Sequence, residues 1–210
     1  MIDFKKIPAY QATTEPDLIN IPPILYVKID GEGSPEGDDF QAAIKAVYGI
    51  FYAIRFWDKK HKPPKGYDKF TSAPTEAIWW TPVGQEFDPD KPEEWHWTAL
   101  IRVPDFVTQE FFEKVIAELV SDKGAGGYKK ARLETVHEGC SVQILHLGPY
   151  DNEKDSLDKL YSYAKGKGYE VYGRHHEIYL NAPKRTVSDK LKTVLRYPVR
   201  LKDTETAINI

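Results

Sequence analysis

The sequence predicts an α+β fold built from two copies of one strand–helix–strand–strand unit. In the first half, a strand at 24–31 precedes a turn, a helix, a loop and a further strand, and the same order follows the strand at 142–148. Each half also ends a strand at a proline, Pro104 and Pro183. Identity between the halves is weak, but a repeated order of elements indicates an internal duplication. We expect the two units to form one antiparallel sheet, with helices on one face and a central ligand cleft.

Hydrophobic periodicity and turn residues place the elements of the first unit. Apolar side chains recur at helical spacing from Phe40 to Ile54 and predict a helix with one buried face. Glycines and Pro35 predict a turn before this helix, and Pro104 ends the last strand of the unit. The predicted elements are an irregular arm at 1–20, a strand at 24–30, the helix, strands at 76–80 and 95–103, and a helix at 105–120.

The second unit follows the same rules. A turn at Gly139 separates two alternating segments, and Gly148 with Pro149 breaks the second of them. Pro198 lies in the last predicted strand and predicts that this strand is at an edge of the sheet, because proline cannot donate to a ladder. The predicted elements are strands at 131–137 and 141–147, a helix around 157–164, and strands at 175–180 and 192–199.

The whole chain of 210 residues is expected to form a single domain, 1–210, with pseudo-repeats at about 21–121 and 128–200. A net charge of −3 with scattered Lys and Arg argues against direct binding of nucleic acid, which needs a concentrated basic face. No apolar run approaches the roughly 20 residues that span a bilayer. The N-terminus lacks a signal peptide and the single Cys140 forms no internal disulfide, so we expect a cytoplasmic protein. A monomer is the default expectation, because the sequence says little about the oligomeric state.

The predicted strand at 175–180 carries the strongest indication of a site. Side chains alternate along a strand, so His175, Glu177 and Tyr179 share one face, and the opposite face carries Ile178. We expect the apolar face to pack on the helices and the polar face to look into the cleft. A carboxylate among aromatic rings can hold a cation or act as a general acid or base. The alternative, an ordinary salt-bridged glutamate on an open sheet face, is equally compatible with the spacing.

Tryptophans on two predicted strands supply candidate walls for the cleft. Trp79 and Trp80 point to opposite faces, so one of them faces the cleft, whereas Trp95 and Trp97 share a face whose orientation the sequence leaves open. The ordinary interpretation is that one ring is core and the other lies at the surface. If the rings do form a cage, a cationic ligand gains about 0.5–2 kcal/mol per ring.

Metal and cofactor sites are not predicted. Adjacent histidines on a strand diverge, which leaves His175 and Glu177 as two ligands, too few for a zinc site. The glycines form no phosphate-binding loop, and no nucleophile motif is present. We therefore expect neither a metal nor an organic cofactor.

Several motifs together resemble one family, the GyrI-like small-molecule-binding superfamily, in its branch of stand-alone bacterial proteins. The resemblance runs from about residue 3 to 199. Its motifs are Tyr26-Val27-x-Ile29-x-Gly31-x-Gly33-x-Pro35, Pro74-x-Glu76-x-x-Trp79-Trp80, Trp95-x-Trp97-Thr98, Gln143-Ile144-Leu145-His146-x-Gly148-Pro149-Tyr150, and His175-His176-Glu177-Ile178-Tyr179-Leu180. It implies a duplicated βαββ fold of the SHS2 type, related to the effector-binding domains of AraC-type and MerR-type regulators.

The resemblance also implies a function and a set of site residues. Family ligands are flat, apolar and often cationic, and the acidic residue that they meet matches Glu177. Part of the branch resembles enzymes that hydrolyse the cyclopropane of DNA-alkylating natural products, so Glu177 would activate water and Tyr179 would donate to the oxygen that gains charge. The residues expected to bind the ligand are Trp80, Trp97, Tyr150, His175 and Tyr197. The alternative is a non-catalytic protein that sequesters drugs or contacts DNA gyrase.

Overall fold

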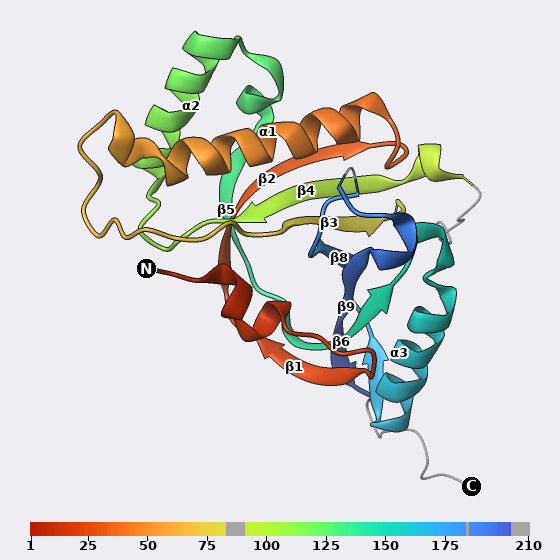
Figure 1. The fold of residues 1–210 in the computed structure, drawn as a ribbon. Coiled ribbons are helices and arrows are strands. Elements are labelled where there is room, and N and C mark those ends of the chain that lie inside the picture. Colours follow the sequence, from red (N-terminus) through yellow and green to blue (C-terminus); the bar gives the residue numbers. More distant parts are fainter. Residues whose placement is uncertain (83–90, 184, 203–210) are drawn as a thin grey trace, which may run out of the picture.

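The computed structural model describes residues 1–82, 91–183 and 185–202, and they form one continuous antiparallel sheet with helices at both ends (Figure 1). The strands run in the order β1-β6-β9-β8-β3-β4-β2-β5, with the short β7 beside β9. Their bounds are β1 Asp17–Ile21, β2 Ile24–Glu32, β3 Thr75–Trp80, β4 His96–Arg102, β5 Arg132–Val136, β6 Gly139–Leu147, β7 Tyr169–Val171, β8 His175–Tyr179 and β9 Lys192–Leu201. The α+β class and the antiparallel sheet are confirmed.

The two halves of the sheet have the same strand order, read outward from the pairing of β8 with β3. On one side of that pair β9 and β6 follow, and on the other side β4 and β2 follow. Each half therefore places its first strand outermost and its last strand in between, as a duplicated unit requires. The outer edges are extended by exchange between the halves, because β1 from the N-terminal segment pairs with β6, and β5 pairs with β2.

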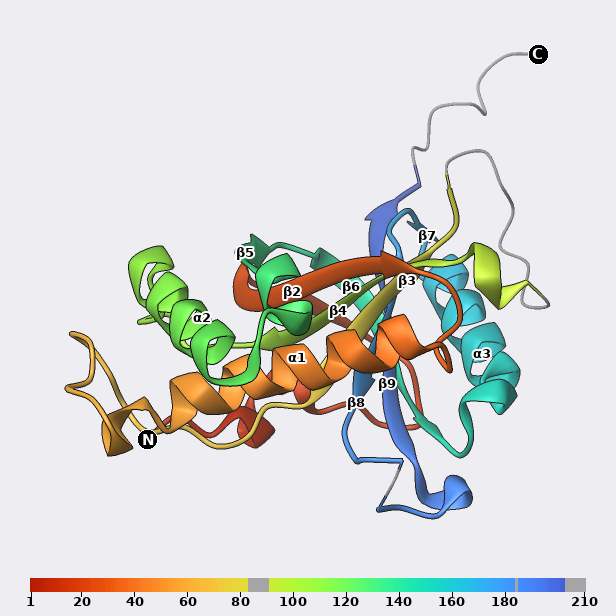
Figure 2. The ribbon, with the colours of Figure 1, turned by 90° about the horizontal axis from the view of Figure 1, so that it is seen from above.

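Among the described residues, three α-helices accompany the sheet: α1 Asp38–Arg55, α2 Gln109–Lys123 and α3 Lys154–Gly166. Helix α1 packs on β2 and β4, α2 packs on α1, and α3 packs on β6 and β7. Seen from above, α1 and α2 lie over one end of the sheet and α3 lies beside the other end (Figure 2). None of the described helices is long and apolar enough to cross a bilayer.

The N-terminal segment differs from the expected irregular arm. It forms two short 3₁₀ helices, Phe4–Lys6 and Pro8–Tyr10, and then the strand β1. Ala9 belongs to an apolar cluster with residues of β2 and β4 on the sheet face opposite α1. Sequence periodicity could not reveal this role, because these elements are too short for their buried side chains to show a repeating spacing.

The prediction that Pro198 places the last strand at an edge is wrong. Strand β9 lies inside the sheet, between β6 and β8. Its pairing with β8 ends at Arg196 and its pairing with β7 begins at Val199, so Pro198 falls in the gap between two partner strands. The missing N–H is therefore not needed for a ladder there, and the Pro198 carbonyl still accepts from the N–H of Tyr172, at 3.2 Å.

The expected orientation of β8 is also wrong in one respect. Its His176 and Ile178 face away from α1 and α3, toward the N-terminal segment, where Tyr10 contacts Glu76 of the neighbouring strand. His175, Glu177 and Tyr179 lie on the same face as the helices. The cleft is therefore on the helical side of the sheet, between α1 and α3, and not on the side opposite to the helices.

Candidate functional site

A cavity of about 2420 Å³ opens between α1 and α3. The strands β3, β8 and β9 provide its floor, with Thr75, Glu177 and Tyr197, and α1 provides one wall that includes Phe40. The segment that leads into α3 provides the other wall, including Tyr150. Because small-molecule sites usually measure roughly 300–1,000 Å³, this space admits a ligand of considerable size.

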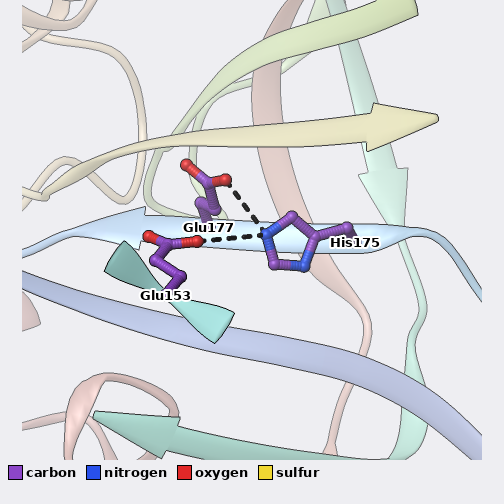
Figure 3. A group of neighbouring side chains, drawn as sticks. All are labelled: Glu153, His175 and Glu177. Atoms are coloured by element: carbon purple, nitrogen blue, oxygen red, sulfur yellow. Dashed lines mark hydrogen bonds and ion pairs between the residues drawn. The ribbon is translucent and has the colours of Figure 1, made fainter. Parts of the chain in front are cut away.

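Two carboxyl groups and one imidazole lie together on the floor of the cavity (Figure 3). The Nε2 atom of His175 is 3.0 Å from Oε1 of Glu177 and 3.9 Å from Oε2 of Glu153. Strand alternation places His175 and Glu177 side by side on β8, whereas Glu153 reaches them from the start of α3. We call these three residues the carboxylate cluster.

Glu153 is the functional residue that the sequence analysis missed. Burial and the nearby Glu177 raise the pKa of its carboxyl to about 9, so this group keeps its proton at neutral pH. Its Oε1 atom is buried without a hydrogen-bond partner, and its side chain makes no capping bond although it stands at the N-cap of α3. In sequence, a glutamate before a helix indicates only an ordinary helix start, so nothing distinguished this one.

Replacing Glu153 with glutamine is expected to stabilise the protein at alkaline pH. The raised pKa means that the folded state holds a proton that the unfolded chain releases near pH 4.5, so wild-type stability falls as the pH rises from there toward 9. The neutral amide removes this loss, and we expect a gain of about 2 kcal/mol at pH 8, or roughly 4–8 °C in Tm. Thermal unfolding at pH 5 and pH 8 measures it, and an equal Tm change at both pH values would contradict the assigned protonation.

Tyrosines surround the carboxylate cluster. The Tyr179 hydroxyl donates to Oε2 of Glu177 at 2.7 Å, and the ring of Tyr197 lies 4.9 Å from the imidazole of His175. Burial and the nearby carboxyl groups raise the pKa of Tyr179 well above its ordinary value and the pKa of Tyr150 to about 12. These phenols therefore stay protonated and act as hydrogen-bond donors.

Six of the seven expected site residues line the cavity, and Trp97 does not. Glu177, Tyr179, His175, Tyr150, Tyr197 and Trp80 all line the cavity. Trp97 does not, because its ring is buried in the core against Phe40 at 5.2 Å and lies directly over Gly31, where a Cβ would come within 2.3 Å of the ring.

Two other tryptophans form the aromatic wall. Trp79 and Trp95 line the cavity with their ring centroids 5.8 Å apart, and Phe40 packs on Trp79 at 4.8 Å. Trp80 lies on the other face of β3, stacked on His96 with the guanidinium of Arg174 3.8 Å from its centroid, and it reaches only the rim. A site for a flat apolar molecule is therefore walled by rings from α1, β3 and the segment before β4.

The carboxylate cluster also bears on metal binding. Its three ligand atoms all lie within 4.8 Å of one another, so Glu153 adds the third ligand that the sequence argument lacked. Two carboxyl groups and an imidazole are a donor set that divalent cations accept. Without a metal, the proton on Glu153 keeps this carboxyl neutral and so reduces its repulsion with Glu177. Since the three residues could also hold a cation, the expectation that no metal binds stays a prediction.

A second charged network lies on the opposite face of the same strands. His176 donates from Nδ1 to Glu138 at 2.8 Å and lies 2.9 Å from Glu76, and Arg196 binds Glu138 at 3.1 Å. Tyr10 also donates to Glu76, and Arg196 donates to the carbonyl oxygen of Ala9. These side chains are almost fully buried, so this buried network joins the N-terminal segment to the sheet beneath the cavity.

Comparison with known proteins identifies the family and solved structures of the same fold. The family model for a GyrI-like small molecule binding domain matches residues 14–200, which confirms the resemblance deduced from the motifs. The chain is similar to an uncharacterized conserved protein from Listeria innocua, with 32% identity, a TM-score of 0.90, and 95% of this chain and 100% of that chain covered. It is also similar to a hydrolase from Listeria innocua, with 31% identity, a TM-score of 0.88, and 95% and 99% covered.

A more distant likeness shows the fold alone. The C-terminal domain of EcmrR is 14% identical, with a TM-score of 0.59 and 90% of this chain and 98% of that chain covered. No curated protein sequence matches this chain. Because the family model spans most of the sequence and the Listeria structures are similar over almost its whole length, the chain belongs to the GyrI-like small molecule binding family.

Proposed function

We propose that this protein binds flat, hydrophobic and often cationic small molecules in the aromatic cavity, and that it hydrolyses the cyclopropane ring of cyclopropanoid DNA-alkylating compounds. The observation that carries the proposal is the pairing of Glu177 with the protonated Glu153 on the floor of an aromatic cavity. One carboxyl group that accepts a proton beside one that donates a proton is the arrangement that general acid–base catalysis needs. The similarity to two hydrolases, at 30% and 31% identity, supports hydrolysis.

Substrate binding follows from the walls of the cavity. A flat electrophile stacks against Trp79 and Trp95, with Tyr150 and Tyr197 closing the site near the carboxylate cluster. Burial among these rings removes water from the substrate except where the carboxylate cluster holds it. The rings therefore orient the strained bond toward Glu177.

The reaction adds one water molecule to the substrate. Glu177 takes a proton from water while the water oxygen bonds to the methylene carbon of the cyclopropane, and the ring C–C bond breaks. Its electron pair moves through the conjugated system to the carbonyl oxygen, which receives the proton of Glu153. The Tyr150 hydroxyl, which keeps its proton, donates a hydrogen bond to that oxygen as its charge grows.

The carboxylate cluster can then return to its starting state. After turnover Glu177 holds a proton and Glu153 has lost one, and the Nε2 atom of His175 faces both carboxyl groups, at 3.0 Å from Glu177 and 3.9 Å from Glu153. Transfer of that proton back to Glu153 restores the acid and the base without net gain or loss. From the sequence we expected Tyr179 to donate to the oxygen that gains charge, but its hydroxyl already donates to Glu177. We therefore assign Tyr179 as a positioning residue that fixes the direction of the carboxylate, and Tyr150 as the donor.

The test is hydrolysis of a cyclopropanoid alkylator in ¹⁸O-labelled water, followed by mass spectrometry. We expect EDTA-dialysed protein to yield a ring-opened product that carries the label, because the attacking oxygen comes from water. The surface variant Glu118→Gln, which alters a carboxylate that contacts His61 outside the cavity, serves as the matched control. A substrate that is bound but not consumed would reject hydrolysis, and turnover that is lost with EDTA and restored by zinc would reject the metal-free mechanism.

A binding protein without chemistry is the second candidate, and the raised pKa of Glu153 favours it as well. A cavity that holds a proton on a buried carboxyl favours positive charge, so an organic cation can displace that proton. In that case affinity for cations rises with pH and falls with salt, and no product forms.

A further inference from the structure

The cavity extends well beyond the carboxylate cluster, along the face of α1. Ile44, Tyr48 and Tyr52 follow one another at intervals of four residues, so they form a row on one side of the helix, and all three line the cavity. Ser72 and Arg185 line the cavity as well. We call this part, formed by Tyr48, Tyr52, Ser72 and Arg185, the phenolic end.

Hydrogen bonds connect the phenolic end to a guanidinium behind it. Arg55 donates from Nη1 to Oγ of Ser72 at 2.7 Å, and that oxygen lies 3.0 Å from the hydroxyl of Tyr52. The Tyr52 hydroxyl lies 3.3 Å from that of Tyr48, and the two rings pack in a T-shaped arrangement with centroids 4.8 Å apart. The side chains are therefore fixed by one another, and their hydroxyl groups are held together at the cavity wall.

The two ends of the cavity have opposite charge. At the carboxylate cluster, the charged groups that raise the pKa of Tyr150 are Glu177 and Glu153. At the phenolic end, burial would raise the pKa of Tyr52, but its hydrogen bonds and the charges of Arg55 and Arg185 outweigh burial and lower it. Phenols at one end thus face carboxyl groups, and phenols at the other end face guanidinium groups.

We propose that the phenolic end is a second subsite, which binds an anionic or hydrogen-bond-accepting tail of an elongated ligand whose flat head occupies the carboxylate cluster. This inference rests on the proposed function, because it assumes that the head binds beside Glu177. It narrows the ligand class to elongated molecules with a flat apolar or cationic head and a terminal acceptor, of which a carboxylate is the strongest. The hydroxyl groups of Tyr48 and Tyr52 line the cavity with the guanidinium of Arg185, and the charge of Arg55 lies behind them. This arrangement suits such an acceptor and would not favour a second cation.

The test uses N-alkyl acridinium dyes, whose flat head has a fixed positive charge. A series with tails of increasing length ends either in a carboxylate or in its methyl ester, and binding is followed by fluorescence. We expect one range of tail lengths at which the wild-type protein binds the carboxylate about fivefold to tenfold more tightly than the ester. Shorter tails, which cannot reach the phenolic end, should show no preference for the carboxylate.

Conservative variants test whether the preference for the carboxylate arises at the phenolic end. Tyr48→Phe and Arg185→Gln change exposed side chains, and each should remove most of the preference for the carboxylate without changing the affinity for the dye that has only a short alkyl group. The matched controls are Tyr172→Phe and Arg200→Gln, which change an exposed tyrosine and an arginine outside the cavity. The two side chains contact each other, Tyr172 directly after β7 and Arg200 on β9. These controls should keep the full preference.

The outcomes separate the inference from the function on which it rests. If the short dye binds through Glu177 but no tail length favours the carboxylate, the second subsite is rejected and the proposed function stands. A preference that persists in both Tyr48→Phe and Arg185→Gln also rejects the subsite. If the short dye does not bind to the wild-type protein at all, the proposed binding of the head is rejected as well.

Discussion

Replacing Glu177 with glutamine is expected to lower kcat for cyclopropanoid hydrolysis by about 10²–10⁴-fold while the protein stays folded. The amide has nearly the same shape, but it cannot accept the proton of the attacking water. Glu177 is partly exposed to the cavity, and its two hydrogen-bonding neighbours, Tyr179 and His175, can both still pair with an amide. Binding of a neutral flat ligand should therefore change little.

The pH dependence provides a second measure of the same pair. Glu153 must be protonated to act as the acid, so the wild-type rate should fall as the pH rises through about 9. Because Glu177 contributes to the raised pKa of Glu153, the residual activity of Glu177→Gln should fall at a lower pH than the wild-type activity.

Steady-state kinetics with Glu118→Gln as the control separates these effects from a general loss of protein. A Glu177→Gln variant that keeps kcat within about threefold of the wild type would exclude Glu177 as the base. Loss of affinity for cationic ligands without any measurable turnover in the wild type would instead favour the binding protein.

Replacing Glu138 with glutamine is expected to reduce the free energy of unfolding by about 3–5 kcal/mol, because it leaves two buried cations without their shared counter-charge. Glu138 accepts from both His176 and Arg196, and Arg196 is fully buried. This loss corresponds to roughly 6–20 °C in Tm for a chain of this size. The matched control is Glu134→Gln, which removes an exposed carboxylate on the edge strand β5. Glu134 pairs with Arg132 on the same strand and with Lys28 on β2, and its replacement should cost at most about 1 kcal/mol.

The pH dependence of the wild-type protein also tests the role of the buried network, and this test does not require Glu138→Gln to fold. Burial would raise the pKa of Glu138, but His176 and Arg196 lower it to about 2. Its contribution to stability is therefore complete above the unfolded pKa near 4.5 and is lost as the pH falls through 2. Burial would lower the pKa of His176, but Glu138 and Glu76 raise it to about 9.

Stability from His176 is accordingly complete below its unfolded pKa near 6.5 and is lost as the pH rises through 9. The imidazole resonances of His176 should titrate near pH 9 in NMR spectra of the folded protein. Titration below pH 6.5, together with a Glu138→Gln Tm close to that of Glu134→Gln, would contradict the assigned role of the network.

The sequence predicted the parts of this molecule that depend on local periodicity. Alternation along a strand placed His175, Glu177 and Tyr179 on one face, and that face does line the cavity. The repeated order of elements likewise predicted a duplicated antiparallel sheet with a cleft where its halves meet. These inferences succeed because strand and helix periods are set by the backbone alone.

Contacts between distant segments could not be predicted in the same way. The N-terminal segment covers the opposite sheet face and binds the buried network, and Pro198 lies inside the sheet because it meets the gap between β7 and β8. No local pattern encodes either arrangement. Both depend on which distant strands pair and on where the sheet is extended at its edges.

The residues of the site likewise fall into those that local periodicity predicted and those that only tertiary contacts placed. The sequence by itself determined that Glu177 would share a strand face with the rings of His175 and Tyr179. Only the tertiary structure decided that Glu153 would join them from α3, that Trp79 and Trp95 rather than Trp97 would form the wall, and that Tyr48 and Tyr52 would face the same cavity. The physical reason is that alternation fixes the direction of a side chain relative to its own strand, whereas the burial and charge that define a site come from the elements that pack against that strand.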